Sequence, residues 1–97
     1  MSDPRVRLAM FLLEELALRG GCSKLRFLKT WRMMVFWLGP DYARHIVQRL
    51  VEGKYIEYRM DKICLAREFP CRRSLTALLR EAEEFVKQLF ATLFKSR

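Results

Sequence analysis

The stretch PDYARHIVQRLVEGKYIEYRMDKICLAR, residues 40–67, decides the fold of this chain. Its first half opens on Pro40, which suits the first turn of a helix, and then repeats apolar side chains with the helical period. Gly53 interrupts that pattern. The first half therefore predicts a helix over about 40–52. Its second half alternates apolar and polar residues in two short runs, which predicts a β-hairpin directly after the helix.

The predicted hairpin has its turn centred on Asp61-Lys62. In that register Met60 pairs with Ile63 and Tyr58 pairs with Leu65. Apolar side chains then stay together on one side of the hairpin, which is the condition that fixes strand register when one face is buried.

Three further helices are expected around this stretch. Asp3 and Pro4 start the first, which ends at Gly20-Gly21, as N-cap and glycine signals predict. Ser23 is placed to cap a second helix that runs to about residue 37. Ser74 is placed to cap a last helix that runs to about residue 95. We assign residues 1–70 to a core and residues 71–97 to a C-terminal helix of the same domain.

The order helix, helix, helix, hairpin, helix covers most of the chain and resembles winged-helix DNA-binding domains. It is most similar in plan to small dimeric regulators of archaea and their viruses. The resemblance implies a mostly α fold with three helices, a two-stranded wing and a long C-terminal helix that pairs subunits.

The charge of the chain favours an anionic partner. The formal net charge is +8 at pH 7, and nucleic acid is the commonest partner of so basic a small protein. No acidic residue occurs between Leu16 and Pro40, where several cations cluster. Arginine outnumbers lysine, and its planar guanidinium suits phosphate because it donates two hydrogen bonds at once.

The resemblance assigns three groups of side chains to duplex DNA. The helix over 40–52 would enter the major groove and read bases through Arg44, His45, Gln48 and Arg49. The preceding helix would contact phosphates through Ser23, Lys24, Arg26, Lys29 and Arg32. The wing would add Arg59 and Lys62. The alternative for each of these residues is an ordinary charge on a solvated surface.

The apolar content predicts a homodimer. Hydrophobic residues make up 52% of the chain, which is more than so small a monomer easily buries. The surplus lies on the first and last helices and marks the expected interface: Leu8, Phe11, Leu12, Leu78, Phe85, Leu89, Phe90, Leu93 and Phe94. The alternative is that these two helices wrap the core of one monomer.

The cysteines and the single histidine argue against a metal site. Cys22, Cys64 and Cys71 form no CxxC pair, and with His45 their spacing fits no zinc pattern. Buried thiols are expected, with a Cys64–Cys71 disulfide as the alternative if the source is a hyperthermophile. The absence of asparagine and the scarcity of glutamine hint at such a source, a hot-environment archaeon or its virus.

Nothing in the sequence predicts catalysis, a cofactor or membrane insertion. No Gly-rich phosphate loop, metal motif or long apolar segment occurs, and the N-terminus lacks the pattern of a signal peptide. We expect a soluble intracellular protein that is not an enzyme. It would bind duplex DNA as a homodimer, as a transcriptional regulator or architectural factor. The alternative is a non-catalytic subunit of a replication, transcription or ribonucleoprotein complex.

Overall fold

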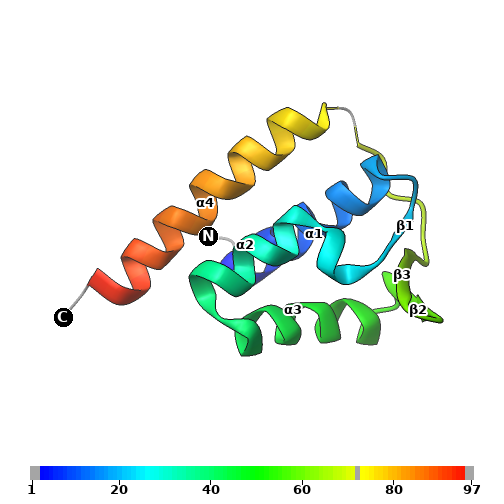
Figure 1. The fold of residues 1–97 in the computed structure, drawn as a ribbon, viewed down its shortest axis with the longest axis horizontal. Helices are drawn as coiled ribbons and strands as arrows, with labels where there is room; N and C mark the ends of the chain where they lie inside the picture. Colours follow the sequence, from blue (N-terminus) through cyan, green and yellow to red (C-terminus); the bar gives the residue numbers. More distant parts are fainter. Residues whose placement is uncertain (1–2, 72, 96–97) are drawn as a thin grey trace.

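The computed structural model describes residues 3–71 and 73–95 and is mostly helical, with a small sheet at one end (Figure 1). Its elements in chain order are α1 (Pro4–Leu18), β1 (Cys22–Ser23), the 3-10 turn η1 (Leu25–Phe27), α2 (Lys29–Leu38), α3 (Pro40–Glu52), β2 (Ile56–Arg59), β3 (Lys62–Leu65) and α4 (Leu75–Lys95). Parts of the predicted segments 1–70 and 71–97, namely residues 1–2, 72 and 96–97, lie outside the described residues.

Helix α1 begins as the sequence predicts. The Asp3 carboxylate accepts a hydrogen bond from the backbone N–H of Arg5, and Pro4 occupies the first helical turn. Gly20 and Gly21, both with φ near +97°, then turn the chain out of the helix. This left-handed backbone costs glycine little and other residues more. α1 therefore has the N-cap and the glycine end that were expected.

The sheet has three antiparallel strands in the order β1–β3–β2. The hairpin β2–β3 was predicted, but its register was wrong by two residues, because Tyr58 pairs with Ile63 and Arg59 with Lys62. The turn therefore consists of Met60 and Asp61. Met60 adopts a left-handed φ of 59° and its side chain is 100% exposed. A two-residue shift keeps each side chain on the same face, so Ile63 still points into the core.

The second helix begins later than predicted. Residues 22–23 form β1, which pairs with Ile63 and Cys64 of β3, and η1 follows before α2 begins at Lys29. The role expected for Ser23 as a helix cap is therefore wrong. Its hydroxyl instead donates to the backbone oxygen of Lys24. Residues 22–23 form a strand instead of the start of a helix because pairing with β3 satisfies the hydrogen-bonding groups of their backbone.

The N-terminus of α2 is capped from another helix. Glu15 of α1 is completely buried, and its carboxylate accepts hydrogen bonds from the backbone N–H groups of Lys29 and Thr30, at 2.8 and 2.7 Å. The oxygen that accepts from Lys29, Oε2, also accepts from Nε of Arg19 at 2.7 Å. A carboxylate at a helix N-terminus satisfies unpaired donors and interacts favourably with the helix dipole.

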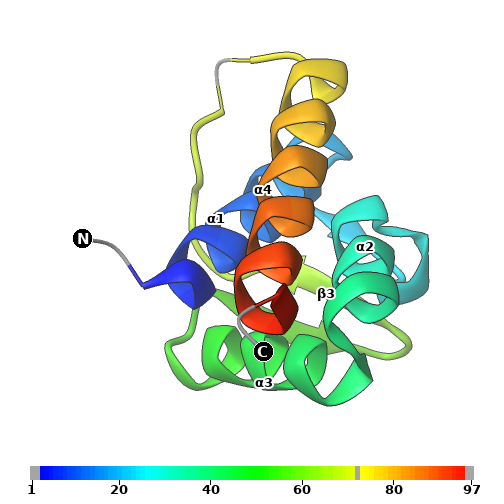
Figure 2. The same cartoon turned by 90° about the vertical axis from the view of Figure 1, so that its left-hand side faces the viewer.

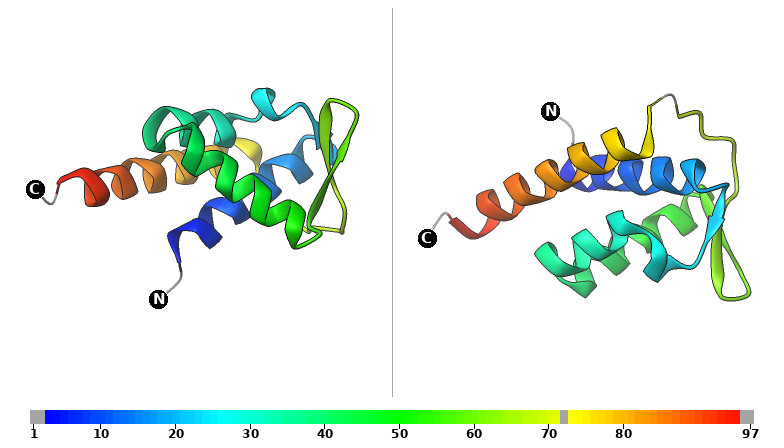
Figure 3. Two further views of the ribbon diagram at one scale, coloured as in Figure 1. Left: turned by 90° about the horizontal axis from the view of Figure 1, so that it is seen from below. Right: turned by 45° about the horizontal axis from the view of Figure 1, so that its top comes forward.

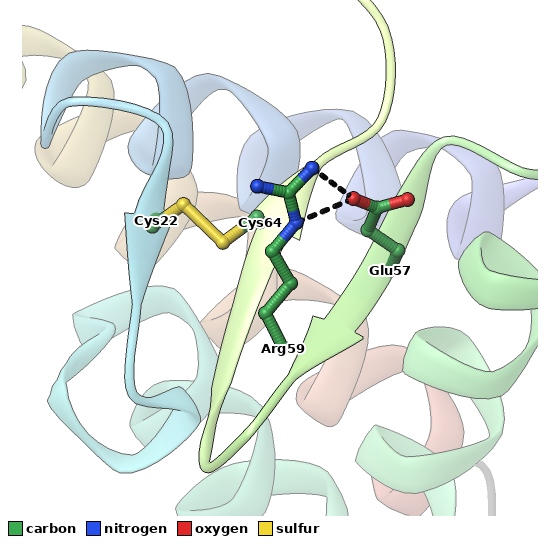
Figure 4. Close-up of a disulfide and its surroundings, with 4 residues drawn as sticks. All are labelled: Cys22, Glu57, Arg59 and Cys64. Carbon is green, nitrogen blue, oxygen red and sulfur yellow. Dashed lines mark hydrogen bonds and ion pairs between the residues drawn. A yellow bond between two sulfur atoms is a disulfide. The ribbon is translucent and has the colours of Figure 1, made fainter.

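A disulfide joins Cys22 of β1 to Cys64 of β3 (Figure 4). Both the buried thiols expected for these two residues and the alternative Cys64–Cys71 bridge were wrong. Cys22 and Cys64 are directly opposite in the sheet, which brings together residues 42 positions apart in the chain. Cys71 is a free thiol, and its Sγ lies 3.5 Å from a carboxylate oxygen of Glu14.

Helix α4 packs back across α1 and α2, and its C-terminal end projects past the other helices, opposite the sheet (Figures 1 and 3). Its start matches the prediction, since the Ser74 hydroxyl accepts from the backbone N–H of Ala77. Arg73 ties this start to the body through ion pairs with Glu14 of α1 and Glu81 of α4. Hydrogen bonds with Glu14 are the main cause that raises the pKa of Arg73.

The core lies between the four helices and the inner face of the sheet (Figure 2). Four residues expected at a dimer interface are buried here within one chain: Leu8, Phe11, Leu12 and Leu78. That part of the prediction was wrong because α4 folds along α1 and covers its apolar face. Phe11 and Phe85 meet edge to face across these helices, with ring centroids 5.8 Å apart. No helix in residues 3–71 and 73–95 combines the length and the apolarity that a membrane crossing requires.

Candidate nucleic-acid interface

Helix α3 presents a fully exposed polar surface, as predicted. The bounds of α3 match the expected 40–52, because Gly39 and Pro40 start it and Gly53 ends it. Six side chains form what we call the α3 face: Asp41, Arg44, His45, Gln48, Arg49 and Glu52. Two cations and two carboxylates make this face neutral in sum. Its affinity for a phosphate backbone would therefore depend on cations from neighbouring elements.

Two of the predicted base readers are engaged with acids of their own helix. Arg44 donates to the Asp41 carboxylate at 2.6 Å, and Gln48 donates to Glu52 at 3.3 Å. Both side chains remain exposed. Exposed ion pairs of this kind contribute little free energy, so a phosphate or base edge can replace the acid at small cost.

The other two predicted readers lie toward the start of α1. His45 and Arg49 line a shallow pocket of about 200 Å³ together with Asp3 and Arg5. Hydrogen bonds from the Arg5 backbone and side chain lower the pKa of Asp3, and the charge of Arg49 acts in the same direction. The N-terminus of α1 thus adds one cation and one carboxylate to this edge of α3.

The hairpin carries the two cations that were expected at a wing, but they differ in availability. Arg59 donates to Glu57 on its own strand at 2.6 Å (Figure 4). Lys62 is exposed and has no ion-pair partner among the described residues. Lys62 is therefore the more accessible of the two for a phosphate.

The hairpin turn is linked to the segment before α2. Lys24 forms an ion pair with Asp61 at 3.2 Å. The hydrogen bond from Lys24 is the main cause that holds the pKa of Asp61 below its ordinary value. The charged groups of Lys24 and Arg26 also lie within 6 Å of the centroid of the Phe27 ring, at a distance where a cation is attracted to an aromatic ring. Arg26 has no ion-pair partner in the part of the chain that the structure describes.

The remaining predicted phosphate contacts, Lys29 and Arg32, lie in a groove between α2 and α4. This α2–α4 groove has a volume of about 600 Å³ and is lined by Lys29, Arg32, Met33, Phe36, Trp37, Leu79, Arg80, Glu83 and Lys87. Four of these nine side chains are cationic and one is acidic. The structure therefore separates Lys29 and Arg32 from the hairpin and places them beside two cations of α4.

Arg80 and Lys87 were missed by sequence reasoning. They lie seven residues apart and outside the buried stripe of α4, so the sequence marks them only as surface residues. The packing of α4 against α2 brings them to the groove, and no local signal predicts that packing. Lys87 pairs with Glu83 at 3.5 Å and stands over the Trp37 ring, whereas Arg80 has no ion-pair partner among the described residues.

An aromatic cluster extends from the groove along the free end of α4. Trp37 meets Phe90 with ring centroids 5.3 Å apart, and Phe90 meets Phe94 at 4.8 Å. Phe85, Leu89 and Phe90 are half-buried, while Leu93 is 48% and Phe94 51% exposed. These five residues of α4 are the part of the predicted dimer interface that is not buried within the core of the chain.

Across 3–71 and 73–95, no three His, Cys, Asp or Glu side chains are grouped where they would hold a metal ion. The zinc arrangement weighed from the sequence is also lost because Cys22 and Cys64 are joined in a disulfide.

Comparison of the chain with protein-family models, with curated proteins and with solved structures found no match.

Proposed function

We propose that this chain is a DNA-binding domain of winged-helix type that holds duplex DNA against α3 and the hairpin. The observation that carries the proposal is the connection of elements. α2 and α3 pack as a pair joined through Gly39, the hairpin follows α3 directly, and β1 completes a sheet in the order β1–β3–β2. Such a helix pair presents its second helix to a major groove and its hairpin to the adjacent backbone.

The available side chains suggest a division of roles. His45, Gln48 and Arg49 stand on the outer side of α3 and would contact base edges, with Arg44 exchanging Asp41 for a phosphate or a guanine. Arg26 and Lys62 are exposed, lie close in sequence to Lys24 and Asp61, which pair with each other, and would contact phosphates. The net charge of +8 supports a general attraction to DNA.

We propose further that two chains associate through the free end of α4. Leu93 and Phe94 expose apolar surface on the segment that projects beyond the other helices (Figure 3). Burial of those side chains against a second copy would be favourable at roughly 25 cal/mol per Å² of apolar surface. A two-fold dimer would place two α3 helices in successive major grooves about 34 Å apart, as a regulator or architectural factor of palindromic sites requires.

The test is a mobility-shift titration on duplex DNA at several salt concentrations. Wild type should bind with an affinity that falls steeply with salt. Arg26→Ala and Lys62→Ala should each weaken binding to all duplexes and flatten the dependence of log K on log salt by about 0.9 per lost phosphate contact. Gln48→Ala should cost about 1–3 kcal/mol on a preferred duplex and much less on random sequence.

Arg7→Gln is the matched control, because it removes one charge from the α1–α4 side of the molecule, where Arg7 pairs with Glu81. It should reproduce the wild-type salt slope. If the Arg26 and Lys62 variants also keep the wild-type slope, the assignment of the duplex to this face is wrong.

A second function is favoured by one observation, the exposure of large apolar side chains outside the α3 face. Phe36 is 79% exposed, and Leu93 and Phe94 are about half exposed. A non-catalytic subunit of a larger replication, transcription or ribonucleoprotein assembly would bury them against a protein partner. Absence of any salt-dependent duplex binding by the isolated chain would favour this second function.

A further inference from the structure

We infer that the α2–α4 groove binds single-stranded nucleic acid, with Phe36 as a stacking platform for a base. The groove is separate from the α3 face, so the inference does not depend on the proposal for duplex DNA. It follows from three properties of the lining residues: their charge, the exposure of one aromatic ring and the way that ring is held.

The charge of the groove is strongly one-sided. Lys29 and Arg32 approach from α2, and Arg80 and Lys87 approach from α4, so cations line both walls. Glu83 is the single carboxylate among the lining residues, and Lys87 already pairs with it. Lys29, Arg32 and Arg80 have no ion-pair partner within the described residues. Like charges on facing helices repel, and a polyanion laid between them removes that repulsion.

Phe36 gives this cationic groove an aromatic surface that the fold does not use. Its side chain is 79% exposed, which makes it the most exposed phenylalanine of the described chain. It stands on the same outward ridge of α2 as Lys29 and Arg32, at the spacing that places these residues on one helix face. An exposed ring between cations matches the pattern of proteins that bind single strands, where bases stack and phosphates follow a basic track.

Phe36 makes one aromatic contact with the rest of the fold. Phe36 meets Trp37 edge to face, with centroids 5.3 Å apart and planes at 84°. Trp37 is in turn packed between Phe90 and the ammonium group of Lys87. The contact with Trp37 restrains the Phe36 ring on one side, while 79% of the side chain stays exposed at the edge of the groove. A preorganised ring loses less conformational freedom when a base stacks on it.

A single strand fits these features better than a duplex. Bases in a duplex are already stacked on their neighbours, so an exposed ring on a protein surface gains nothing from them without unstacking. An unpaired base offers its face directly, and the tolerance of stacking for any base predicts weak sequence preference. An acidic peptide would satisfy the cations but would leave Phe36 exposed.

The experiment measures fluorescence anisotropy of a labelled oligo-dT of about 12 nucleotides, a length within the range of single-strand sites. Wild type should bind it. Phe36→Ala should weaken binding roughly 5- to 150-fold, the range that corresponds to loss of one stacked base. Phe36→Tyr should restore it, because the tyrosine ring stacks as well. Arg80→Ala should lower the salt slope by about 0.7, the value for one phosphate contact on a single strand.

Two variants serve as controls. Tyr58→Ala removes an exposed ring that does not line the groove, and Arg7→Gln removes a charge elsewhere; both should bind the strand as wild type does. Circular dichroism of Phe36→Ala should match wild type, since the side chain is exposed. If the spectrum of Phe36→Ala does differ from wild type, the Phe36→Tyr variant, which keeps an aromatic ring at this position, decides the test instead.

The outcomes separate this inference from the duplex proposal. An unlabelled duplex that binds the protein without displacing the strand supports two distinct sites, whereas full displacement of the strand by that duplex overturns the separate groove site. Equal binding of a poly-glutamate peptide, with no effect of Phe36→Ala, would show recognition of negative charge alone and would overturn the inference. Strand binding without duplex binding would support the groove and remove the proposal for α3.

Discussion

At the scale of single residues, Glu15 is a charged side chain with a structural role. It is the only fully buried carboxylate in the described residues, and it joins α1 to the start of α2 through two backbone N–H groups. The sequence did not reveal this role. Glu15 lies among leucines in a helical pattern, and its partners are 14 and 15 positions away, so no capping signal near Lys29 pointed to it.

We expect Glu15→Ala to destabilise the fold by about 2–6 kcal/mol, because two backbone N–H groups lose their acceptor and each such loss costs about 1–3 kcal/mol. Urea denaturation followed by circular dichroism measures the change. Glu84→Ala on the exposed side of α4 is the matched control and should change stability by less than about 0.5 kcal/mol. Equal stability of the two variants would show that water replaces the carboxylate.

The ion pair between Lys24 and Asp61 leads to a second prediction at this scale, which concerns the pKa of Asp61. The pKa of the Asp61 carboxyl should lie below its ordinary value, because Lys24 donates a hydrogen bond to the ionised form. A lowered pKa in the folded state means that the pair stabilises the fold above the unfolded pKa. That contribution is lost as the pH falls through the folded pKa.

NMR titration of the Asp61 side-chain carbon gives this pKa directly. Lys24→Met should raise the pKa of Asp61 toward the ordinary value, whereas Lys62→Met, which removes a neighbouring charge of lesser effect, should raise it less. An Asp61 pKa that does not respond to Lys24→Met would contradict the link between the hairpin turn and the segment before α2.

At the scale of elements, the sequence predicted what depends on nearby residues and missed what depends on distant ones. α3 was placed correctly because Pro40 and Gly53 mark both of its ends locally. The start of α2 was misplaced because residues 22–23 form a strand that pairs with β3, some 40 positions away in the chain. No local sequence pattern predicts that pairing. The hairpin was expected, yet its register depended on Met60 accepting a left-handed backbone, which a methionine rarely does.

The candidate site was predictable to the same extent. All four expected base readers lie exposed on α3, because helical periodicity fixes which side chains face outward. The grouping of the α2 cations was not predictable, because Lys29 and Arg32 meet Arg80 and Lys87 only through the packing of α4. Periodicity assigns a side chain to a face of its own helix and leaves open which helix that face will meet.

The Cys22–Cys64 bridge leads to a prediction about how much the disulfide in the sheet stabilises the fold. Closing a loop of 42 positions restricts the unfolded chain, and bridges of this kind stabilise by about 2–4 kcal/mol. The variant with both cysteines changed to serine should lose that amount in guanidinium denaturation. Wild type in a strong reductant should fall to the same level.

Cys71→Ser tests whether this effect belongs to the bridge, because Cys71 is the free thiol. It should keep the wild-type stability and the wild-type response to reductant. A reductant response that disappears in Cys71→Ser would instead point to exchange of the disulfide with this third cysteine.

At the scale of the whole molecule, the monomer accounts for most of its own hydrophobic content. α1 and α4 cover each other, which is the alternative to dimerisation that the sequence left open for Leu8, Phe11, Leu12 and Leu78. Some large apolar side chains remain exposed on α1, η1, α2, the hairpin and the end of α4. The pairing proposed through Leu93 and Phe94 uses only those at the end of α4, so its interface would be smaller than the one that the sequence predicted.

We expect the double variant Leu93→Ser, Phe94→Ser to be a folded monomer, because both side chains are about half exposed and outside the core. Wild type should be a dimer by light scattering at micromolar concentration. Val6→Ser and Met10→Ser on the exposed side of α1 form the matched control and should leave the dimer intact. A wild-type monomer would remove the proposed pairing through α4.

The bridge between Cys22 and Cys64 also divides the chain into a covalent ring and two tails. The ring contains η1, α2, α3 and β2, while α1 and α4 lie outside it. A protease cut at the α2–α3 junction would consequently release no fragment, since both halves remain joined through sulfur. Most of the surface proposed for DNA thus lies within one covalently closed loop. The end of α4 proposed for self-association lies outside this loop, so a protease could remove it without opening the loop.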